Sequence, residues 1–357
     1  MVMLKHWIAA NMVEGIGPAR LKKLMDEHGS IEKVCAAIDA PVLKAEEEIR
    51  SAETKNIRIF SVEDNGYPFL LKQIHDPPPV IYVKGDLLEK DKNAIAIVGT
   101  RIASRYGLNT AKQFAFELAS LGITVISGMA LGIDAAAHEG ALDAGGRTIA
   151  VLGCGVDRIY PPENSELYSK IIEKGGAIVS EYPIGFPHDK WTFPQRNRII
   201  SGLSLGVIII EGGYKSGAMI TAKVALEQGR EVFAVPQNID SELGRGPHWL
   251  IKQGAKLVES VDDVLDELKF QIPNLKTCPE RIEGSQTNPK SQLQKTRPEN
   301  LSTEEEKIYN VLSATPKHFD QITISCGLSV QQVASLLTML EIKKIVHQLP
   351  GKLFILQ

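Results

Sequence analysis

The stretch AIAIVGTRIAS at residues 94–104 contains the first clear unit of a strand, a glycine turn and a helix start. Five small or branched apolar residues in a row are typical of a strand that is buried on both faces of a parallel sheet. The glycine at position 99 ends this strand, and the apolar spacing from Ser104 to Leu121 predicts a helix. The stretch therefore predicts one β-strand followed by one α-helix.

The same unit recurs along the central part of the chain. Further apolar strands are expected at residues 123–126, 148–152, 177–180, 207–210 and 232–235, and helices at 163–174 and 219–228. Residues 193–198 are expected in a loop that leads into a helix. Strands that alternate with helices through short connections predict an α/β fold, a Rossmann-like doubly wound parallel sheet.

The flanking sequence predicts two further domains and a linker. Residues 1–60 carry apolar side chains at helical spacing and predict a small helical domain. The α/β domain is expected to cover residues 61–270. Residues 271–300 are rich in Pro, Gln, Asn, Lys, Thr and Ser and predict a flexible linker. Residues 301–357 predict a winged-helix domain of three helices and a hairpin.

The sequence does not decide whether either terminal domain contacts DNA or protein. The turn at Gly15-Ile16-Gly17 resembles a helix-hairpin-helix, a motif that presents N–H groups to DNA phosphates, but a tight turn in a packing domain would have the same sequence. In the winged helix, residues 329–340 hold the recognition position and carry Gln331 and Gln332 but no arginine. That helix suits protein docking as well as DNA contact.

Composition limits the partners and the compartment. A formal net charge of −3 argues against a protein coated in basic surface, so a nucleic-acid site would have to be a local cleft. The cysteines Cys35, Cys154, Cys278 and Cys326 follow no CxxC spacing and predict thiols in a reducing compartment, without a metal site. No signal-peptide pattern and no apolar run of about 18 residues occurs, which predicts a cytoplasmic protein without a membrane span.

Two common nucleotide-binding motifs are missing from the expected strand ends. The run after the first strand, residues 99–104, does not match the GxGxxG fingerprint, which disfavours NAD or FAD. The glycine-rich turn at residues 212–217 lacks the spacing of a P-loop, which disfavours an ATPase. No cofactor is therefore expected.

Basic side chains and glycines gather instead at the expected carboxyl edge of the sheet, where α/β proteins bind ligands. Arg196 and Arg198 are separated by one residue, and burying either without a partner would cost roughly several kcal/mol. Either these arginines pair with acids such as Glu181 and Glu211, or they bind a polyanion. The turn at residues 212–217 favours the polyanion, because its glycines allow close approach and a helix begins there.

Six motifs, in this order, resemble the DNA-processing protein A family, also called DprA or Smf. They lie at residues 99–107, 127–138, 150–161, 180–183, 193–203 and 216–222 and span nearly the whole central domain. The resemblance implies a non-enzymatic single-stranded DNA-binding protein that protects incoming DNA during natural transformation, helps to displace single-strand-binding protein and loads the RecA recombinase. It also implies a homodimer formed through the Rossmann-like domain.

Within that resemblance, two groups of residues are expected to bind the DNA strand. Phosphates are assigned to the side chains or backbone amides of Gly99, Arg101, Ser104, Arg105, Gly128, Lys190, Arg196, Arg198, Lys215, Ser216 and Gly217. A base is expected to stack on Phe193, with or without Trp191, and core packing of Phe193 is the alternative. Asn197 is expected either to orient a base edge or to hold its loop. No catalytic residue and no metal ligand is assigned.

Two rival functions stay open. Rossmann-like nucleotide hydrolases of the lysine-decarboxylase-like group use a Pro-Gly-Gly-x-Gly-Thr-x-x-Glu signature whose glutamate serves the chemistry, but residue 220 of this chain is Ile. Asp134 and His138 lie four residues apart and suggest acid–base catalysis, although a brace for its own loop explains Asp134 better. A scaffold for recombination proteins would explain the terminal domains and leave the basic loops without a role.

Overall fold

A computed structural model of the chain describes residues 2–269, 271, 302–312, 317–343, 345–349 and 353–356. The chain divides into two compact units, with the boundary between residues 278 and 279. The linker predicted at residues 271–300 lies outside the described residues except for residue 271, and so does Cys278. No helix in the described ranges is both long and apolar enough to cross a membrane.

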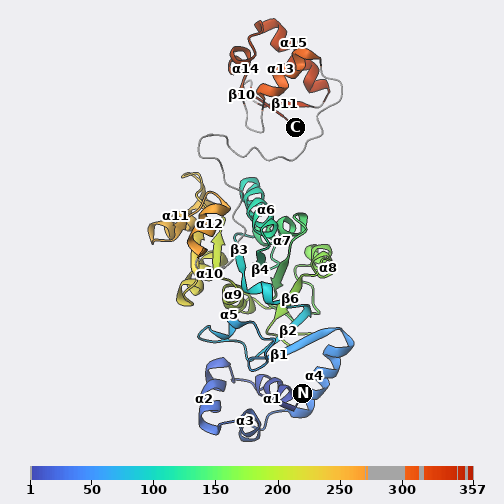
Figure 1. The fold of residues 1–357 in the computed structure, drawn as a ribbon, viewed down its shortest axis with the longest axis vertical. Helices are drawn as coiled ribbons and strands as arrows, with labels where there is room; N and C mark the ends of the chain where they lie inside the picture. Colours follow the sequence, from blue (N-terminus) through green and yellow to red (C-terminus); the bar gives the residue numbers. More distant parts are fainter. Residues whose placement is uncertain are drawn as a thin grey trace. The chain divides into compact units, whose positions relative to one another are not determined.

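A nine-stranded sheet forms the centre of the first unit, within residues 2–271 (Figure 1). Its strands follow the order β1-β2-β6-β5-β4-β3-β7-β8-β9. They are β1 (Ile57–Ser61), β2 (Val80–Gly85), β3 (Ala94–Val98), β4 (Thr124–Ser127), β5 (Thr148–Val151), β6 (Ala177–Ser180), β7 (Gly206–Ile209), β8 (Glu231–Ala234) and β9 (Lys256–Leu257). Neighbours from β6 to β9 are parallel, whereas β2 is antiparallel to β1 and β6. The predicted Rossmann-like, doubly wound α/β sheet is confirmed.

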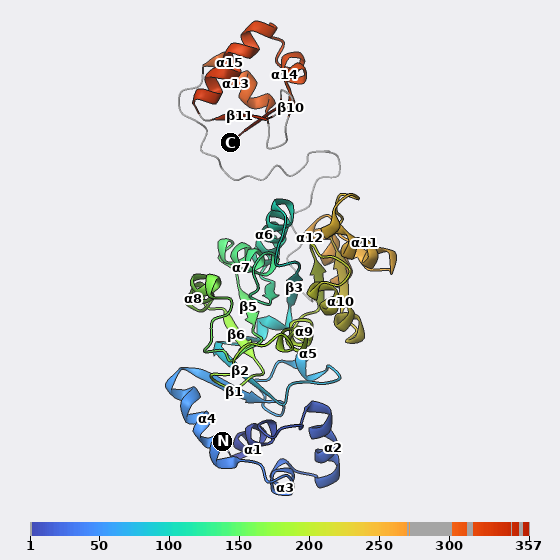
Figure 2. The same ribbon diagram turned by 180° about the vertical axis from the view of Figure 1, so that it is seen from behind.

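Helices cover both faces of this sheet, because its strands are apolar on both sides (Figure 1 and Figure 2). In β3, Ala94, Ala96 and Val98 belong to the core on one face and Ile95 and Ile97 to the core on the other. The first face carries α5 (Phe69–Lys72), α9 (Thr192–Gly202), α10 (Gly217–Glu227) and α11 (Arg245–Lys252). The second face carries α6 (Arg105–Ser120), α7 (Ile133–Asp143), α8 (Ser165–Glu173) and α12 (Val261–Leu268).

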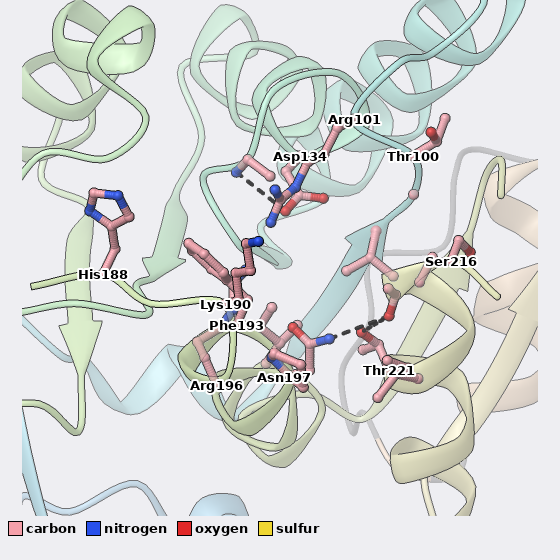
Figure 3. Close-up of a pocket in the computed structure, with 18 of the residues that line it drawn as sticks. Thr100, Arg101, Asp134, His188, Lys190, Phe193, Arg196, Asn197, Ser216 and Thr221 are labelled. Carbon is pink, nitrogen blue, oxygen red and sulfur yellow. Dashed lines mark hydrogen bonds between the residues drawn. The ribbon is translucent and has the colours of Figure 1, made fainter.

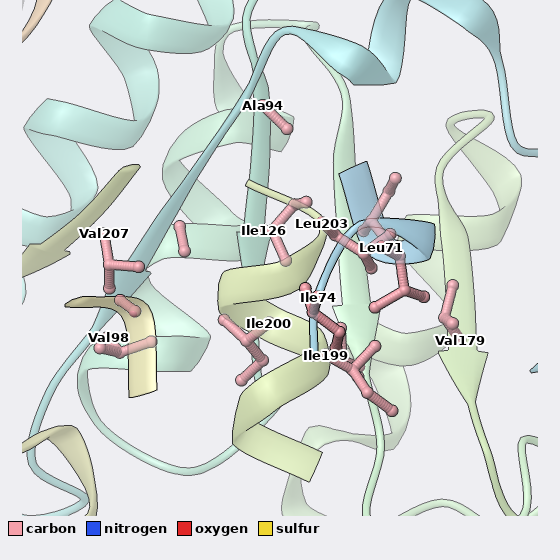
Figure 4. Packing of buried hydrophobic residues seen from close by; sticks show 14 of the residues in the cluster. Leu71, Ile74, Ala94, Val98, Ile126, Val179, Ile199, Ile200, Leu203 and Val207 are labelled. Atoms are coloured by element: carbon pink, nitrogen blue, oxygen red, sulfur yellow. The ribbon is translucent and has the colours of Figure 1, made fainter. Parts of the chain in front are cut away.

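Helix α9 differs from the sequence-based expectation. The prediction of a loop at residues 193–198 is wrong, because the helix already begins before them. Pro194 lies in its first turn, where a residue without an N–H costs no hydrogen bond. Farther along the helix, Ile199 and Ile200 pack into a buried cluster with Leu71 of α5 (Figure 4). This packing holds α9 on the sheet and fixes the direction of the polar side chains at its start.

The helical prediction for the N-terminal segment is confirmed up to residue 54 and wrong after it. The helices are α1 (Val2–Asn11), α2 (Pro18–His28), α3 (Ile31–Ala37) and α4 (Val42–Thr54). Residues 57–61 form strand β1 instead, whose backbone pairs with β2, so tertiary pairing decides their structure. Trp7 and Ile8 of α1 share a buried cluster with Tyr82 of β2, and the helices therefore pack on this side of the sheet.

The second unit has the predicted winged-helix layout in its described residues. It consists of α13 (Thr303–Val311), β10 (Lys317–His318), α14 (Phe319–Cys326), α15 (Val330–Ile342), β11 (Val346–Leu349) and β12 (Leu353–Leu356). The strand order is β10-β12-β11. Ile308, Val333 and Leu340 belong to a buried cluster of this unit's own. On α15, Gln331 and Gln332 are exposed, as predicted.

Candidate functional site

A cleft of about 840 Å³ opens at the carboxyl ends of β3 and β7 (Figure 3). The chain leaves β3 toward α6 on one face of the sheet and leaves β7 toward α10 on the other face. Neighbouring strands whose connections diverge in this way form the switch point at which doubly wound sheets bind ligands. Helix α9 makes the third wall of the cleft.

Among the predicted site residues, two exposed cations and an aromatic ring meet at this cleft. Arg101 lies on the loop after β3, Lys190 just before α9, and Phe193 in its first turn. Arg101 and Lys190 are exposed, and the guanidinium carbon of Arg101 lies 4.9 Å from the centroid of the partly buried Phe193 ring. The cleft thus combines two cations with an aromatic ring (Figure 3).

Two further aromatic side chains of the cleft have no role in the sequence-based assignment. The ring of Tyr160 lies 5.6 Å from that of Phe193, and the imidazole of His188 stacks on Tyr160 at 3.8 Å and 22°. Tyr160 belongs to one of the six motifs, which is a signal that the sequence offers, but nothing in the local sequence marks His188. Trp191, expected beside Phe193, packs edge-on against Tyr182 and does not line the cleft.

The start of α10 lines the cleft with two predicted residues, Ser216 and Gly217. Ser216 is the N-cap, and its buried Oγ has no hydrogen-bond partner among the described residues. The Nδ2 of Asn197 donates to the carbonyl oxygen of Gly217 at 3.3 Å, so Asn197 holds this turn, which is one of the two roles expected for it. The first N–H groups of a helix lack intrahelical partners and attract anions. Gly99 lines the same cleft.

Arg196 is a buried brace, which corrects its assignment as a phosphate ligand. Only 4% of the residue is exposed, and its guanidinium donates to the carbonyl oxygens of Gly128 and Val151. Burial lowers the pKa of Arg196, and the neighbouring Asp134 acts in the opposite direction. Arg196 therefore ties the ends of β4 and β5 together at the floor of the cleft.

Asp134 holds the neighbouring loop, as expected. Its carboxylate accepts hydrogen bonds from the backbone N–H groups of Gly128 at 3.1 Å and Ala130 at 3.4 Å. Burial raises the pKa of Asp134, while Arg196 and these N–H groups act in the opposite direction. Because the N–H of Gly128 is already bonded to Asp134, the structure corrects the expectation that this amide binds a phosphate.

Arg198 lies outside the cleft in an ion-pair cluster. Its guanidinium contacts Glu181, and its Nε lies 3.2 Å from Oδ2 of Asp76. The side chains of Arg198 and Glu181 are 12% and 14% exposed. Burial raises the pKa of Glu181, and the charge of Arg198 opposes that rise. Pairing with an acid is therefore confirmed for Arg198, and its assignment to DNA is corrected.

The remaining predicted residues lie beside the cleft and not in it. The Oγ of Ser104 accepts a hydrogen bond from the N–H of Gly107 at 3.0 Å and donates to Oε1 of Glu211 at 2.5 Å. Ser104 thus caps α6, which corrects its assignment as a phosphate ligand, and Glu211 bonds to Ser104 and not to the arginines. Arg105 and Lys215 are exposed but do not line the cleft.

Among the described residues of the cleft, the glutamate of the rival hydrolase signature has no counterpart, and Asp134 and His138 are bonded within the fold. Counted from Gly212-Gly213, the glutamate of the rival signature falls on Met219, and the next residue, Ile220, lines the cleft; neither is a carboxylate. Of the described residues, Asp134 and Asp189 are the carboxylates that line it, and Asp134 is engaged by the backbone. His138 is fully buried with its Nδ1 2.6 Å from Oγ1 of Thr148, and burial lowers its pKa to about 3. Within the described ranges, no three His, Cys, Asp or Glu side chains are placed to hold a metal ion.

The fold and the cleft define a Rossmann-like α/β protein with a cleft at its switch point and a winged-helix unit. The family model described as DNA recombination-mediator protein A matches residues 58–269, and the model of the DprA winged helix domain matches residues 292–352. The chain belongs to the DNA recombination-mediator protein A family, the family that the six motifs predict.

Similar proteins come from several bacteria. Protein Smf of Escherichia coli is 38% identical over 78% of this chain and 74% of its own length, and Protein Smf of Synechocystis is 35% identical over 97% of each. The X-ray structure of DprA from Streptococcus pneumoniae has a TM-score of 0.63 at 34% identity and covers 74% of this chain and 97% of its own. A DprA structure from Helicobacter pylori, described for its single-stranded DNA binding mode, has a TM-score of 0.53 at 31% identity and covers 60% and 98%.

Proposed function

We propose that this chain binds single-stranded DNA in its cleft and acts in DNA processing during natural transformation, without catalysing a reaction. The Helicobacter pylori relative is described as having a single-stranded DNA binding mode. Relatives from Bacillus subtilis and Streptococcus pneumoniae are named DNA processing proteins. Open clefts that combine cations with aromatic rings suit a flexible, unpaired strand.

The contact between Arg101 and Phe193 is the observation that carries this proposal. A guanidinium 4.9 Å from the ring centroid supports a phosphate contact at Arg101 beside a base stacked on Phe193. Lys190 adds a second cation, and the start of α10 at Ser216 and Gly217 adds a helix end that favours anions. Contacts to phosphates carry no sequence information, so binding should tolerate any base composition.

Burial decides which predicted residues enter the proposed interface. The interface consists of the predicted residues that line the cleft and are not internal braces: Gly99, Arg101, Lys190, Phe193, Ser216 and Gly217. Asn197 supports the interface by holding the turn at Gly217. Arg105 and Lys215 are exposed beside it and remain candidates for an outer contact with the strand. Arg196 supports the interface from below.

The wider role rests on family membership. We propose that the protein protects incoming DNA, helps to displace single-strand-binding protein, loads the RecA recombinase and acts as a homodimer through the Rossmann-like domain. Strand exchange by RecA on DNA coated with single-strand-binding protein, with and without this chain, tests the loading step. A protein that binds the DNA but leaves strand exchange unchanged would remove that step from the proposal.

Fluorescence anisotropy with labelled oligo(dT) of about 20 nucleotides tests DNA binding directly. We expect tight binding to the single strand, weak binding to a duplex of the same length, and a large loss of affinity between about 50 and about 200 mM salt. Arg101→Ala should weaken binding by about tenfold. Because one phosphate contact is lost, it should also reduce the slope of log affinity against log salt concentration by about one. Arg50→Ala, which changes an exposed arginine of α4 outside the cleft, is the matched control and should bind normally.

Two results would contradict this proposal. Equal affinity for single-stranded and double-stranded DNA would show that the cleft does not select an unpaired strand. Release of free base from nucleoside monophosphates incubated with the protein would instead favour the nucleotide-hydrolase alternative.

A further inference from the structure

His188 forms the outer end of a short aromatic column in the cleft. Its imidazole stacks on Tyr160 at 3.8 Å and 22°, and Tyr160 in turn lies 5.6 Å from Phe193 at an angle of 32°. His188 is exposed, and no other ring of the described residues stacks on it. Tyr160 therefore covers one face of the imidazole. His188 itself is exposed and lines the cleft (Figure 3).

Phe193 is less accessible than His188. The guanidinium of Arg101 lies over its ring, and Tyr160 lies beside it. The backbone of Gly153 also approaches it closely, since a Cβ at Gly153 would lie 3.1 Å from Cδ1 of Phe193. A base therefore has to displace Arg101 before it can stack on the covered face of Phe193, whereas the ring of His188 is already exposed.

Hydrogen bonds tie Asp189, the residue after His188, to the start of α9. The N–H of Asp189 donates to Oγ1 of Thr192 at 3.2 Å, and this hydroxyl donates back to the carbonyl oxygen of Asp189 at 2.8 Å. Lys190 follows in the same turn and is exposed toward the cleft. Asp189 lies between His188 and Lys190 in the sequence and is also exposed, so its negative charge offsets the positive charge of Lys190. A phosphate is therefore attracted by direct contact with Lys190 and not by the net charge of the turn. An aromatic ring and a cation are thus presented together.

We propose that His188 is a second base-stacking residue and that Tyr160 positions it. The inference rests on the proposed function, because it assigns a further base of the bound strand to the same cleft. Histidine is among the side chains on which unpaired bases stack, and such stacking tolerates every base. His188 and Phe193, separated by the ring of Tyr160, then hold two bases of one strand whose phosphates lie near Lys190 and Arg101.

Variants of His188 test this inference in the full chain. We expect His188→Ala to weaken binding of oligo(dT) by about fivefold or more. With an oligonucleotide that carries 2-aminopurine, the same variant should lose part of the fluorescence quenching that stacking causes. His188→Phe should keep the affinity and the quenching because it keeps a flat ring, whereas His188→Lys should lose the quenching. His75→Ala changes an exposed histidine outside the cleft and should match the wild type.

Variants of Tyr160 separate positioning from folding. Tyr160→Phe keeps the ring and should behave as the wild type, while Tyr160→Ala should reduce quenching as His188→Ala does. Thermal unfolding of each variant shows whether the fold is retained. If Tyr160→Ala does not fold, the affinity and quenching of His188→Ala decide whether His188 stacks on a base.

Three outcomes separate this inference from the function on which it rests. Unchanged affinity and quenching in His188→Ala, with weakened binding in Arg101→Ala, would overturn the role of His188 and leave the proposed function intact. Equal losses of affinity in His188→Ala and His188→Phe would also overturn it, because the loss would then not come from the removal of a flat ring. A wild-type protein that does not bind oligo(dT) would overturn both.

Discussion

Arg101 and Arg198 show that burial decides what a basic side chain does in this protein. Arg101 is exposed in the cleft and contacts Phe193, so its charge is available to a ligand. Arg198 is 12% exposed and is neutralised by Glu181 and Asp76. The first arginine is therefore expected to matter for binding and the second for stability.

Replacing Arg198 with alanine should destabilise the fold. The change leaves Glu181 partly buried without its cation, which costs about 3 kcal/mol in the free energy of unfolding. Urea unfolding measures this loss, and Glu181→Gln in the same background should recover part of it. Arg105→Ala, at an exposed arginine, should change stability by less than about 0.5 kcal/mol. Equal stability of Arg198→Ala and Arg105→Ala would show that the ion-pair cluster contributes little to the free energy of unfolding.

His138 should make stability depend on pH below neutrality. Burial lowers its pKa from 6.5 to about 3, so the folded state keeps a neutral imidazole while the unfolded chain binds a proton. The free energy of unfolding is therefore independent of the His138 proton above about pH 6.5. Below that pH, His138 lowers it by up to about 1.4 kcal/mol per pH unit, down to about pH 3. Urea unfolding at about pH 8 and about pH 5 measures the slope, and His138→Gln should remove this part of it. The same dependence of unfolding free energy on pH in the wild type and in His138→Gln would mean that His138 accepts a proton in the folded state.

At the scale of elements, the cleft exists because loops from different strands pack closely on one another. The loop after β3 rests on the start of α7, where the N–H of Ile133 donates to the carbonyl oxygen of Thr100 at 3.2 Å. Gly99 has no room for a side chain, since a Cβ there would lie 2.5 Å from Cγ1 of Ile133. The glycine that ends β3 therefore serves the packing of the loop that carries Arg101.

Adding a methyl group at Gly99 should disturb this loop. Gly99→Ala forces Ile133 or the loop to move, and we expect a loss of about 1–3 kcal/mol in the free energy of unfolding, with weaker DNA binding. Gly213→Ala is the matched control, because a Cβ at Gly213 has no neighbour within 4 Å. Comparable losses in both variants would show that glycine is needed in these turns for another reason.

At the scale of the whole molecule, the two units have separate cores. The sheet and its helices bury their own clusters, and Ile308, Ile322 and Val333 belong to a cluster within the winged-helix unit. All described residues that line the cleft belong to the first unit. On α15 the exposed positions Gln331 and Gln332 carry no charge, so this helix lacks the cations that duplex binding needs.

A chain that ends at residue 271 should therefore fold and bind single-stranded DNA like the full chain. Mobility shifts with single-stranded and double-stranded oligonucleotides, together with thermal unfolding, compare the two proteins. We expect unchanged melting of the first unit and unchanged affinity for the single strand. A clear loss of affinity in the shortened chain would assign part of the binding to the winged helix.

The sequence by itself determined the class of fold and the edge of the sheet where the cleft lies. Uninterrupted apolar runs such as residues 94–98 need burial on both faces, and a glycine at their carboxyl end marks the turn into a helix. These are local requirements, so they can be read without knowing the neighbours. The winged-helix layout follows from the same kind of local pattern.

Only the tertiary structure decided which residues of that edge line the cleft. Arg196 and Arg198 lie two positions apart on one helix, yet one braces strand ends and the other joins acids outside the cleft. The stacking of His188 on Tyr160 joins residues 28 positions apart along the chain. Residues 57–61 became a strand through pairing with β2. In each case the deciding partner lies far away in sequence, and the local pattern carries no information about it.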